Sequence, residues 1–126
     1  MQSIRTDGAP RAIGPYSQGI AYKDLLFLSG QIGLNPKTGV IESSTIEGQT
    51  RQVMSNIQAV LAAVGSDLSR VLKVTVFLSD IQEFTTFNKI YGEFFGELPP
   101  ARSTVEVSKL PRDAKVEIDV IAYRVG

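Results

Sequence analysis

Two oppositely charged side chains in the C-terminal quarter of the chain have the types needed for chemistry on a small acid. Arg102 lies in the stretch PPARSTVEV and Glu117 in the stretch KVEIDV, and apolar residues alternate around both. A guanidinium binds a carboxylate through two parallel hydrogen bonds, and a carboxylate can orient water and accept its proton. The pair could therefore hold an acid group and deliver water beside it.

Side-chain alternation predicts the face of the sheet on which each charge lies. In an extended strand Arg102 and Thr104 point to one side and Val105 to the other. If the apolar rows face the core, Arg102 and Glu117 share the second face. A salt bridge that ties two strands together explains the pair from pattern alone as well as a site does. The residues taken as core-facing are Val105, Val107, Val116, Ile118 and Val120.

Composition removes many mechanisms. The 126 residues include no cysteine and no histidine. Disulfides, thiolate nucleophiles, histidine bases and cysteine or histidine metal ligands are therefore impossible, and we expect neither a metal nor a cofactor. The length fits a single domain spanning residues 1–126.

The charge balance and the N-terminal sequence limit the partners. Thirteen basic and thirteen acidic residues cancel, so no overall field attracts nucleic acid or an anionic membrane. The start, MQSIRTDGAP, has no apolar leader, and no window approaches the roughly 18 apolar residues of a membrane span. We therefore expect a soluble, cytoplasmic protein without a membrane partner.

The first part of the chain is predicted to hold strands around a constrained loop. Residues 3–5 form a short strand, and residues 18–22 and 25–29 form a hairpin. Between them, a Gly-Pro pair restricts the backbone next to Tyr16. Tyr16 is therefore either held out as a site residue or packed against the sheet.

The hairpin runs into the sequence SGQIG. Ser29 offers a hydroxyl group, and Gly30 and Gly33 allow the backbone to come close to a ligand or to another chain. The glycine spacing differs from that of a dinucleotide-binding loop, and no helix follows directly. We therefore interpret this stretch as a place of close approach and not as a phosphate-binding loop.

The middle of the chain is predicted to form a helix and then a strand. Apolar residues recur at helical spacing over residues 46–64, with Thr45 or Ser44 as the N-terminal cap and Gly65 at the end. Residues 68–79 then alternate with period two, which predicts a strand that is central or lies at a subunit contact. Its expected core-facing residues are Leu72, Val74, Val76 and Leu78, with Phe77 on the other face.

A second amphipathic helix is predicted over residues 81–98. Asp80 and Glu83 have the spacing of a capping box, and Pro99 ends the apolar stripe. Asn88 lies at the margin of this stripe, where it is either a packing residue or a ligand contact.

The order of elements predicts an α+β domain with two helices on one face of a mainly antiparallel sheet. The last two strands are expected at about 102–107 and 116–125. Phe77, Ile121 and Tyr123 make the second face too apolar for bulk water. We therefore expect this face to associate with copies of the same chain.

Six stretches spread over nearly the whole chain form a recognisable set of motifs: IGPYSQ, LFLSGQIGLNP, QTRQVMSNIQAVL, VTVFLSDI, FNKIYGEFF and PPARSTVEVSKLPRDAKVEI. With these motifs the chain resembles the RidA (YjgF/YER057c/UK114) family of reactive-intermediate deaminases. The resemblance implies a chorismate-mutase-like fold and a homotrimer with its sheets facing inward and its ligand sites at subunit interfaces.

The resemblance also implies an activity, which is the hydrolysis of 2-imino acids such as 2-iminopropanoate and 2-iminobutanoate to 2-keto acids and ammonia. It places the carboxylate-binding arginine at Arg102, the water-handling glutamate at Glu117 and the site tyrosine at Tyr16. Ser29, Gly30 and Asn88 are implied to contact the substrate. Thr104 stands in the site where many relatives carry cysteine, so properties of that thiol do not carry over.

Two other function classes stay open beside the deaminase. One is a regulatory or chaperone-like module that binds small carboxylates without turnover. The other is an endoribonuclease or translation inhibitor, and it ranks lowest because the chain has no histidine and no net charge with which to attract phosphate.

Overall fold

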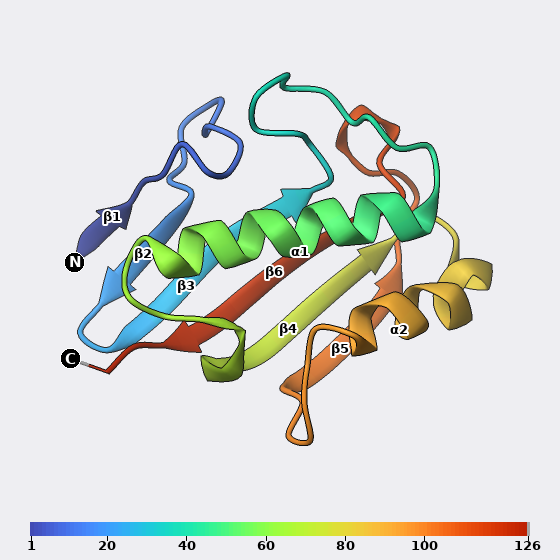
Figure 1. Ribbon diagram of the computed structural model, residues 1–126. Helices are drawn as coiled ribbons and strands as arrows, with labels where there is room; N and C mark the ends of the chain where they lie inside the picture. The colour runs from blue at the N-terminus through green and yellow to red at the C-terminus, as the bar shows by residue number, and fades with distance from the viewer. Residues whose placement is uncertain (126) are drawn as a thin grey trace.

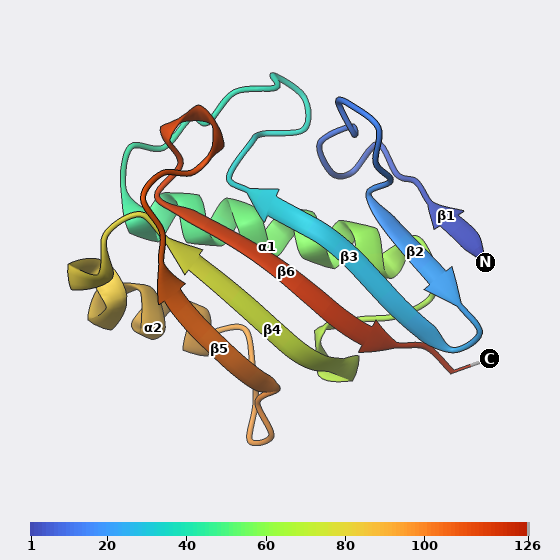
Figure 2. The same ribbon diagram turned by 180° about the vertical axis from the view of Figure 1, so that it is seen from behind.

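The computed structural model describes residues 1–125 and has a layer of helices on one face of a single sheet (Figure 1). Figure 2 shows the opposite face, which no helix covers. Across residues 1–125, no helix is both long and apolar enough to cross a membrane. The strands are β1 (Gln2–Ile4), β2 (Gly19–Tyr22), β3 (Leu25–Ile32), β4 (Val71–Leu78), β5 (Ala101–Glu106) and β6 (Val116–Tyr123), and the helices are α1 (Ile46–Ala62) and α2 (Phe84–Gly92).

The sheet has the strand order β1-β2-β3-β6-β4-β5. Every neighbouring pair is antiparallel except β4 and β5, which are parallel and are joined through α2. This arrangement confirms the predicted α+β fold with a mainly antiparallel sheet. β4 lies between β6 and β5, so its prediction as a central strand is also confirmed.

Helix α1 follows its prediction closely. The Thr45 side chain accepts a hydrogen bond from the Gly48 backbone nitrogen at 3.1 Å, so it is the N-terminal cap. Val53, Ile57 and Leu61 on its inner face are fully buried against the sheet. This packing buries the helix-covered face of β3, β6 and β4 and leaves their other face open.

The second helix is shorter than predicted. A 3-10 turn covers Ile81–Glu83, and α2 ends at Gly92, well before Pro99. Asp80 caps the turn through Gln82, whereas Glu83 pairs with Lys115 at 3.1 Å instead of completing a capping box. The physical reason for the early end is that Gly92 and Gly96 are weak helix formers.

The prediction that Leu72 faces the core is wrong. The register of β4 against β6 shifts between Val71 and Lys73, so a bulge interrupts the alternation. Val71 is buried in its place, and Leu72 is 46% exposed. The predicted period-two core row holds from Val74 to Leu78.

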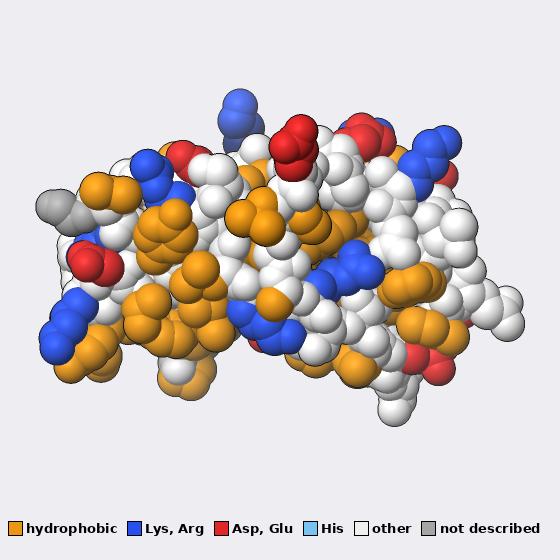
Figure 3. Space-filling view, turned by 90° about the horizontal axis from the view of Figure 1, so that it is seen from below, with side chains coloured by type: hydrophobic (Ala, Val, Ile, Leu, Met, Phe, Trp, Pro, Cys, Tyr) orange, Lys and Arg blue, Asp and Glu red, His pale blue; other side chains and the backbone are white. Residues whose placement is uncertain are grey.

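The open face of the sheet carries exposed apolar side chains. Leu25, Phe27 and Tyr123 lie on neighbouring β3 and β6 and are 41%, 42% and 37% exposed. Seen from below, hydrophobic side chains gather on the side of the molecule where the β2–β3 turn lies, with basic side chains between them (Figure 3). The open face therefore has the apolar character predicted for it.

Candidate functional site

Arg102 and Glu117 lie on opposite faces of the sheet, so the prediction that they share a face is wrong. Arg102 pairs with Val74, which is 1% exposed on the helix-covered side. Glu117 pairs with Phe77 of the same strand β4. Paired residues share a face, and positions 74 and 77 of one strand point to opposite faces.

The error arose at β5, which is an edge strand. Val105 is 44% exposed on the open face, whereas Arg102 and Thr104 form the row beneath α2. The apolar row of β5 therefore faces outward and its polar row faces the helix. Alternating apolar residues predict which face of a strand is buried only when the core covers the strand. At the edge strand β5 the core does not cover the apolar row.

Helix α2 supplies an aromatic wall beside the Arg102 guanidinium. The guanidinium carbon lies 4.8 Å from the ring centre of Tyr91, 5.6 Å from that of Phe84 and 5.9 Å from that of Phe87. These distances suit cation–π attraction. Within residues 1–125, Arg102 forms no salt bridge and no hydrogen bond. The guanidinium therefore packs against aromatic rings, and its N–H donors can bind another group.

Three polar neighbours of Arg102 are buried without partners. Asn88 and Tyr91 lie on the helix surface that meets the guanidinium, and Thr104 lies on the same face of β5. In the described part of the chain, Asn88 Oδ1, Tyr91 Oη and Thr104 Oγ1 have no hydrogen-bond partner. Such an oxygen costs about 1–3 kcal/mol when it is left unpaired. We call Arg102, Asn88, Tyr91 and Thr104 the arginine half-site.

The other predicted residues gather on the opposite side of the sheet. Ser29 and Gly30 form a bulge in β3, because both lie between the pairs Leu28–Val120 and Gln31–Ile118. A cavity of about 590 Å³ is lined by Tyr16, Ser29, Gly30 and Glu117, which we call the glutamate half-site.

The bulge brings the backbone of β3 close to the Glu117 carboxylate. A Cβ atom added to Gly30 would lie 2.5 Å from Glu117 Oε2, so glycine at this position is what allows the carboxylate to lie where it does. Burial raises the pKa of Glu117 above its ordinary value, and the nearby Asp119 carboxylate raises it further. Glu117 therefore holds a proton more firmly than a solvated glutamate does.

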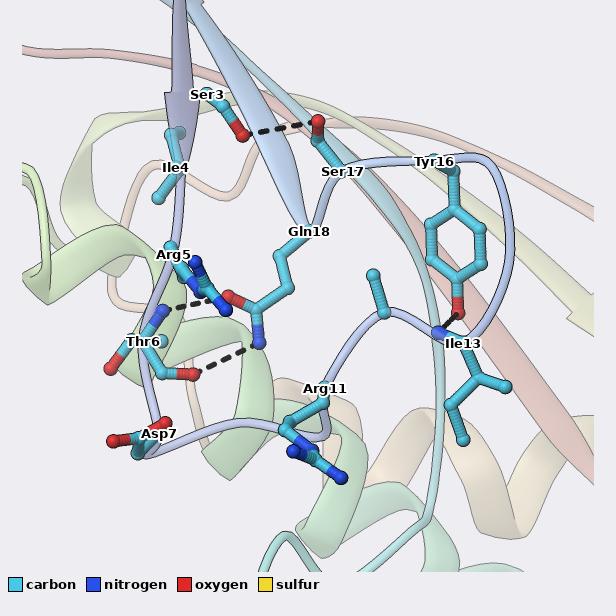
Figure 4. Close-up of a pocket in the computed structure, with 11 residues that line it drawn as sticks. Ser3, Ile4, Arg5, Thr6, Asp7, Arg11, Ile13, Tyr16, Ser17 and Gln18 are labelled. Atoms are coloured by element: carbon cyan, nitrogen blue, oxygen red, sulfur yellow. Dashed lines mark hydrogen bonds between the residues drawn. The ribbon is translucent and has the colours of Figure 1, made fainter.

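The N-terminal loop that carries Tyr16 is clamped by Gln18 (Figure 4). The buried Gln18 amide accepts a hydrogen bond from the Thr6 nitrogen at 2.7 Å and donates to the Thr6 and Pro10 carbonyls at 3.0 and 2.8 Å. The Ile13 nitrogen donates to the Tyr16 hydroxyl at 3.2 Å. Tyr16 is 53% exposed, which agrees with a residue held out from the scaffold.

Ser29 ties this loop to β3. Its hydroxyl donates to the Ser17 carbonyl at 2.6 Å, and its backbone nitrogen donates to the Gln18 carbonyl at 3.0 Å. Sequence reasoning assigned Ser29 to the ligand and overlooked Gln18. The signal for Gln18 was a long amide at the base of a loop rich in glycine and proline, where backbone groups need partners.

Tyr91 was also missed, because its ring falls among the apolar residues of the helix predicted over residues 81–98 and its hydroxyl group was not considered. The available signal was its hydroxyl group among four phenylalanines at positions 84, 87, 94 and 95.

Within the described residues, no group of three or more acidic side chains could hold a metal ion.

Comparison with known proteins gives a consistent result. The model of the Endoribonuclease L-PSP family matches residues 6–124. A RutC family protein of Pyrococcus horikoshii is 52% identical over 121 residues, which are 96% of either chain. Reactive Intermediate Deaminase A of the Arabidopsis thaliana chloroplast is 48% identical over 119 residues, covering 94% of this chain and 64% of that protein. The crystal structure of Escherichia coli TdcF with bound serine has a TM-score of 0.94 at 41% identity and covers 99% of this chain and 100% of that one.

Proposed function

This chain belongs to the Endoribonuclease L-PSP (YjgF/RidA) family, and from that premise we propose that it hydrolyses reactive 2-imino acids to 2-keto acids and ammonia. The proposed substrates are small, such as 2-iminopropanoate and 2-iminobutanoate. The relative named Reactive Intermediate Deaminase A and the serine bound to TdcF support a small amino-acid-derived ligand.

The arginine half-site is the observation that carries the proposal. It combines a guanidinium without an acidic partner and three buried oxygens without hydrogen bonds, all within residues 1–125. A carboxylate satisfies the guanidinium, and a nitrogen with a hydrogen satisfies a buried amide oxygen such as that of Asn88. A 2-imino acid carries both groups on adjacent carbons.

The two half-sites lie on opposite faces of one sheet, so one chain cannot bring them together around a small ligand. We propose that a second copy places its glutamate half-site against the arginine half-site of the first. Each copy then uses different surfaces toward its two neighbours, which is a head-to-tail contact that closes as a ring. The family resemblance favours a ring of three.

The chemistry needs no covalent nucleophile. Arg102 holds the substrate carboxylate, and Glu117 of the neighbouring copy orients a water molecule toward the imine carbon. The imine reacts in its N-protonated form. Glu117 accepts a proton as the water oxygen bonds to the imine carbon, which gives a neutral tetrahedral intermediate with one hydroxyl and one amino group. Glu117 returns that proton to the nitrogen and then takes the hydroxyl proton as the C=O bond forms and the C–N bond breaks, which gives the 2-keto acid and ammonia. Tyr16 and the backbone at Gly30 close the pocket.

The direct test follows the imine itself. A threonine dehydratase reaction generates 2-iminobutanoate, and the decay of the imine is recorded with and without this protein. Faster decay supports the proposal, and an unchanged decay rate contradicts it.

Carboxylate binding without turnover is the second candidate. The same arginine half-site would favour it, and TdcF binds serine, which is not an imine. A protein that binds 2-oxobutanoate but leaves imine decay unchanged would support this candidate. RNA cleavage that is lost when Arg102 is replaced would support the nuclease instead.

We expect Gly30→Ala to lower imine hydrolysis by at least about tenfold. The added methyl group would displace the Glu117 carboxylate, because its carbon would lie 2.5 Å from Oε2. Steady-state rates measure the loss, and Gly96→Ala is the matched control because an added Cβ there meets nothing within 4 Å. Equal rates for Gly30→Ala and wild type would show that Glu117 has no fixed position in the reaction.

We expect Phe27→Asp to weaken self-association. Phe27 is 42% exposed on the open face and pairs with Ile121, so a charge there would be buried in any contact made by this face. Light scattering should give a smaller mass for Phe27→Asp than for wild type at the same concentration. Leu98→Asp is the control, because Leu98 is 93% exposed outside the sheet. An unchanged mass would place the contact elsewhere.

A further inference from the structure

We infer that the Tyr91 hydroxyl is a further substrate-binding group, which donates a hydrogen bond to the acid group held by Arg102. The inference rests on the proposed function, since it concerns the same arginine half-site. In this role the Tyr91 hydroxyl makes the site bind a molecule with a free carboxylate more tightly than a neutral analogue of the same molecule.

Packing alone does not explain a tyrosine at this position. Tyr91 is 6% exposed, and its ring lies 5.4 Å from that of Phe87 and 4.8 Å from that of Phe95. Its aromatic neighbours in this segment are all phenylalanines, which fill space without a polar atom. A phenylalanine at position 91 would pack equally well and would avoid a buried hydroxyl without a partner.

Three neighbouring groups pack against the Tyr91 ring. The rings of Phe87 and Phe95 both contact it, and the Arg102 guanidinium lies 4.8 Å from its centre. Of the three rings beside the guanidinium, that of Tyr91 is the closest. The Tyr91 ring therefore lies against the Arg102 guanidinium, and the inference places the bound acid group within reach of both the guanidinium donors and the Tyr91 hydroxyl.

The protonation state suits a donor. Burial raises the pKa of Tyr91 above its ordinary value, although the Arg102 charge acts in the opposite direction. The phenol therefore stays neutral near pH 7 and keeps its hydrogen. A carboxylate accepts about four hydrogen bonds, and a guanidinium fork supplies two of them, so a neutral hydroxyl adds to the grip of Arg102 without repelling the acid.

The test is Tyr91→Phe, which removes only the hydroxyl. Pyruvate, the 2-keto acid product of 2-iminopropanoate, serves as the probe in a calorimetric titration of the assembled protein. We expect Tyr91→Phe to bind pyruvate at least about tenfold more weakly than wild type. We expect pyruvamide, which lacks the acid group, to bind both proteins equally weakly.

Thermal unfolding of the ligand-free protein separates this role from a structural one. An unpartnered hydroxyl predicts that Tyr91→Phe unfolds at the same temperature as wild type or at a higher one. Tyr22→Phe is the control, because Tyr22 is 52% exposed and far from Arg102 in the sheet order. It should leave pyruvate affinity unchanged.

The outcomes are distinct from those of the proposed function, because pyruvate binding needs no turnover. Wild type that binds pyruvate but leaves imine decay unchanged would contradict hydrolysis, while the Tyr91 comparison would still be readable. Equal pyruvate affinity in Tyr91→Phe and wild type, or no pyruvate binding by wild type, would overturn the inference. A lower unfolding temperature with equal affinity would assign the hydroxyl to a structural contact.

Discussion

Replacing Arg102 with alanine should reduce kcat/KM for imine hydrolysis on the order of 10²- to 10⁴-fold. The variant loses two charge-assisted hydrogen bonds to the substrate carboxylate, each worth about 1.5–3 kcal/mol. It also leaves the oxygens of Asn88, Tyr91 and Thr104 without the ligand that would satisfy them. Initial rates of imine decay at several dehydratase concentrations measure the effect.

Arg102→Lys is the matched variant. It keeps the positive charge but lacks the planar fork, so we expect it to retain only part of the lost activity. Full activity in Arg102→Lys would show that charge alone is needed. An Arg102→Ala protein as active as wild type would remove the arginine half-site from the reaction.

Glu117→Gln should lower kcat on the order of 10²- to 10⁴-fold, because the amide cannot accept the proton of water. In wild type, kcat/KM should rise as pH increases through the pKa of Glu117, since only the carboxylate form is a base. That pKa is raised by burial and by Asp119, so the rise should occur above the pH at which a solvated glutamate titrates. Retention of the wild-type rate in Glu117→Gln would contradict the assigned role.

The placement of the half-sites predicts rescue between the two inactive variants. If Arg102 and Glu117 come from neighbouring copies, some contacts in a mixed ring pair an intact arginine half-site with an intact glutamate half-site. Random mixing in equal amounts restores about a quarter of the sites in a closed head-to-tail ring. Arg102→Ala and Glu117→Gln chains should therefore be unfolded together, refolded and assayed.

Two comparisons make the rescue decisive. Each variant refolded alone should stay inactive, and the two mixed without refolding should gain activity only as subunits exchange. An inactive refolded mixture of the same assembled mass would contradict a site that Arg102 of one copy and Glu117 of its neighbour complete together.

Most elements of this fold could be predicted from the sequence. Strands β2 and β6 and helix α1 repeat a single period along their length, and β3 does so as far as its bulge at Ser29 and Gly30. Local signals such as Thr45 and Gly65 mark the limits of α1. Helix α2 was predicted too long because its apolar stripe continues past Gly92, although Phe94 and Phe95 pack from a loop. An apolar stripe in the sequence indicates which side chains are buried, but it does not show whether the backbone that carries them is a helix or a loop.

The residues of the candidate site were predictable as types, and the glutamate half-site came together as expected. Tyr16, Ser29, Gly30 and Glu117 are joined by the bulge in β3 and by the loop that Gln18 clamps. Arg102, Asn88 and Thr104 also lie in one place, but on the other face. The sequence could not predict this separation.

The sequence by itself determined the elements, the apolar character of the open face and the side chains with useful chemistry, because propensity, periodicity and residue type act locally. Only the tertiary structure decided that Arg102 faces helix α2 while Glu117 faces the open side. Alternation fixes which residues of one strand share a face, but the pairing of β5 with β4 fixes which face of the sheet that is. β5 is an edge strand whose apolar row is not covered by the core, so its own pattern pointed the wrong way.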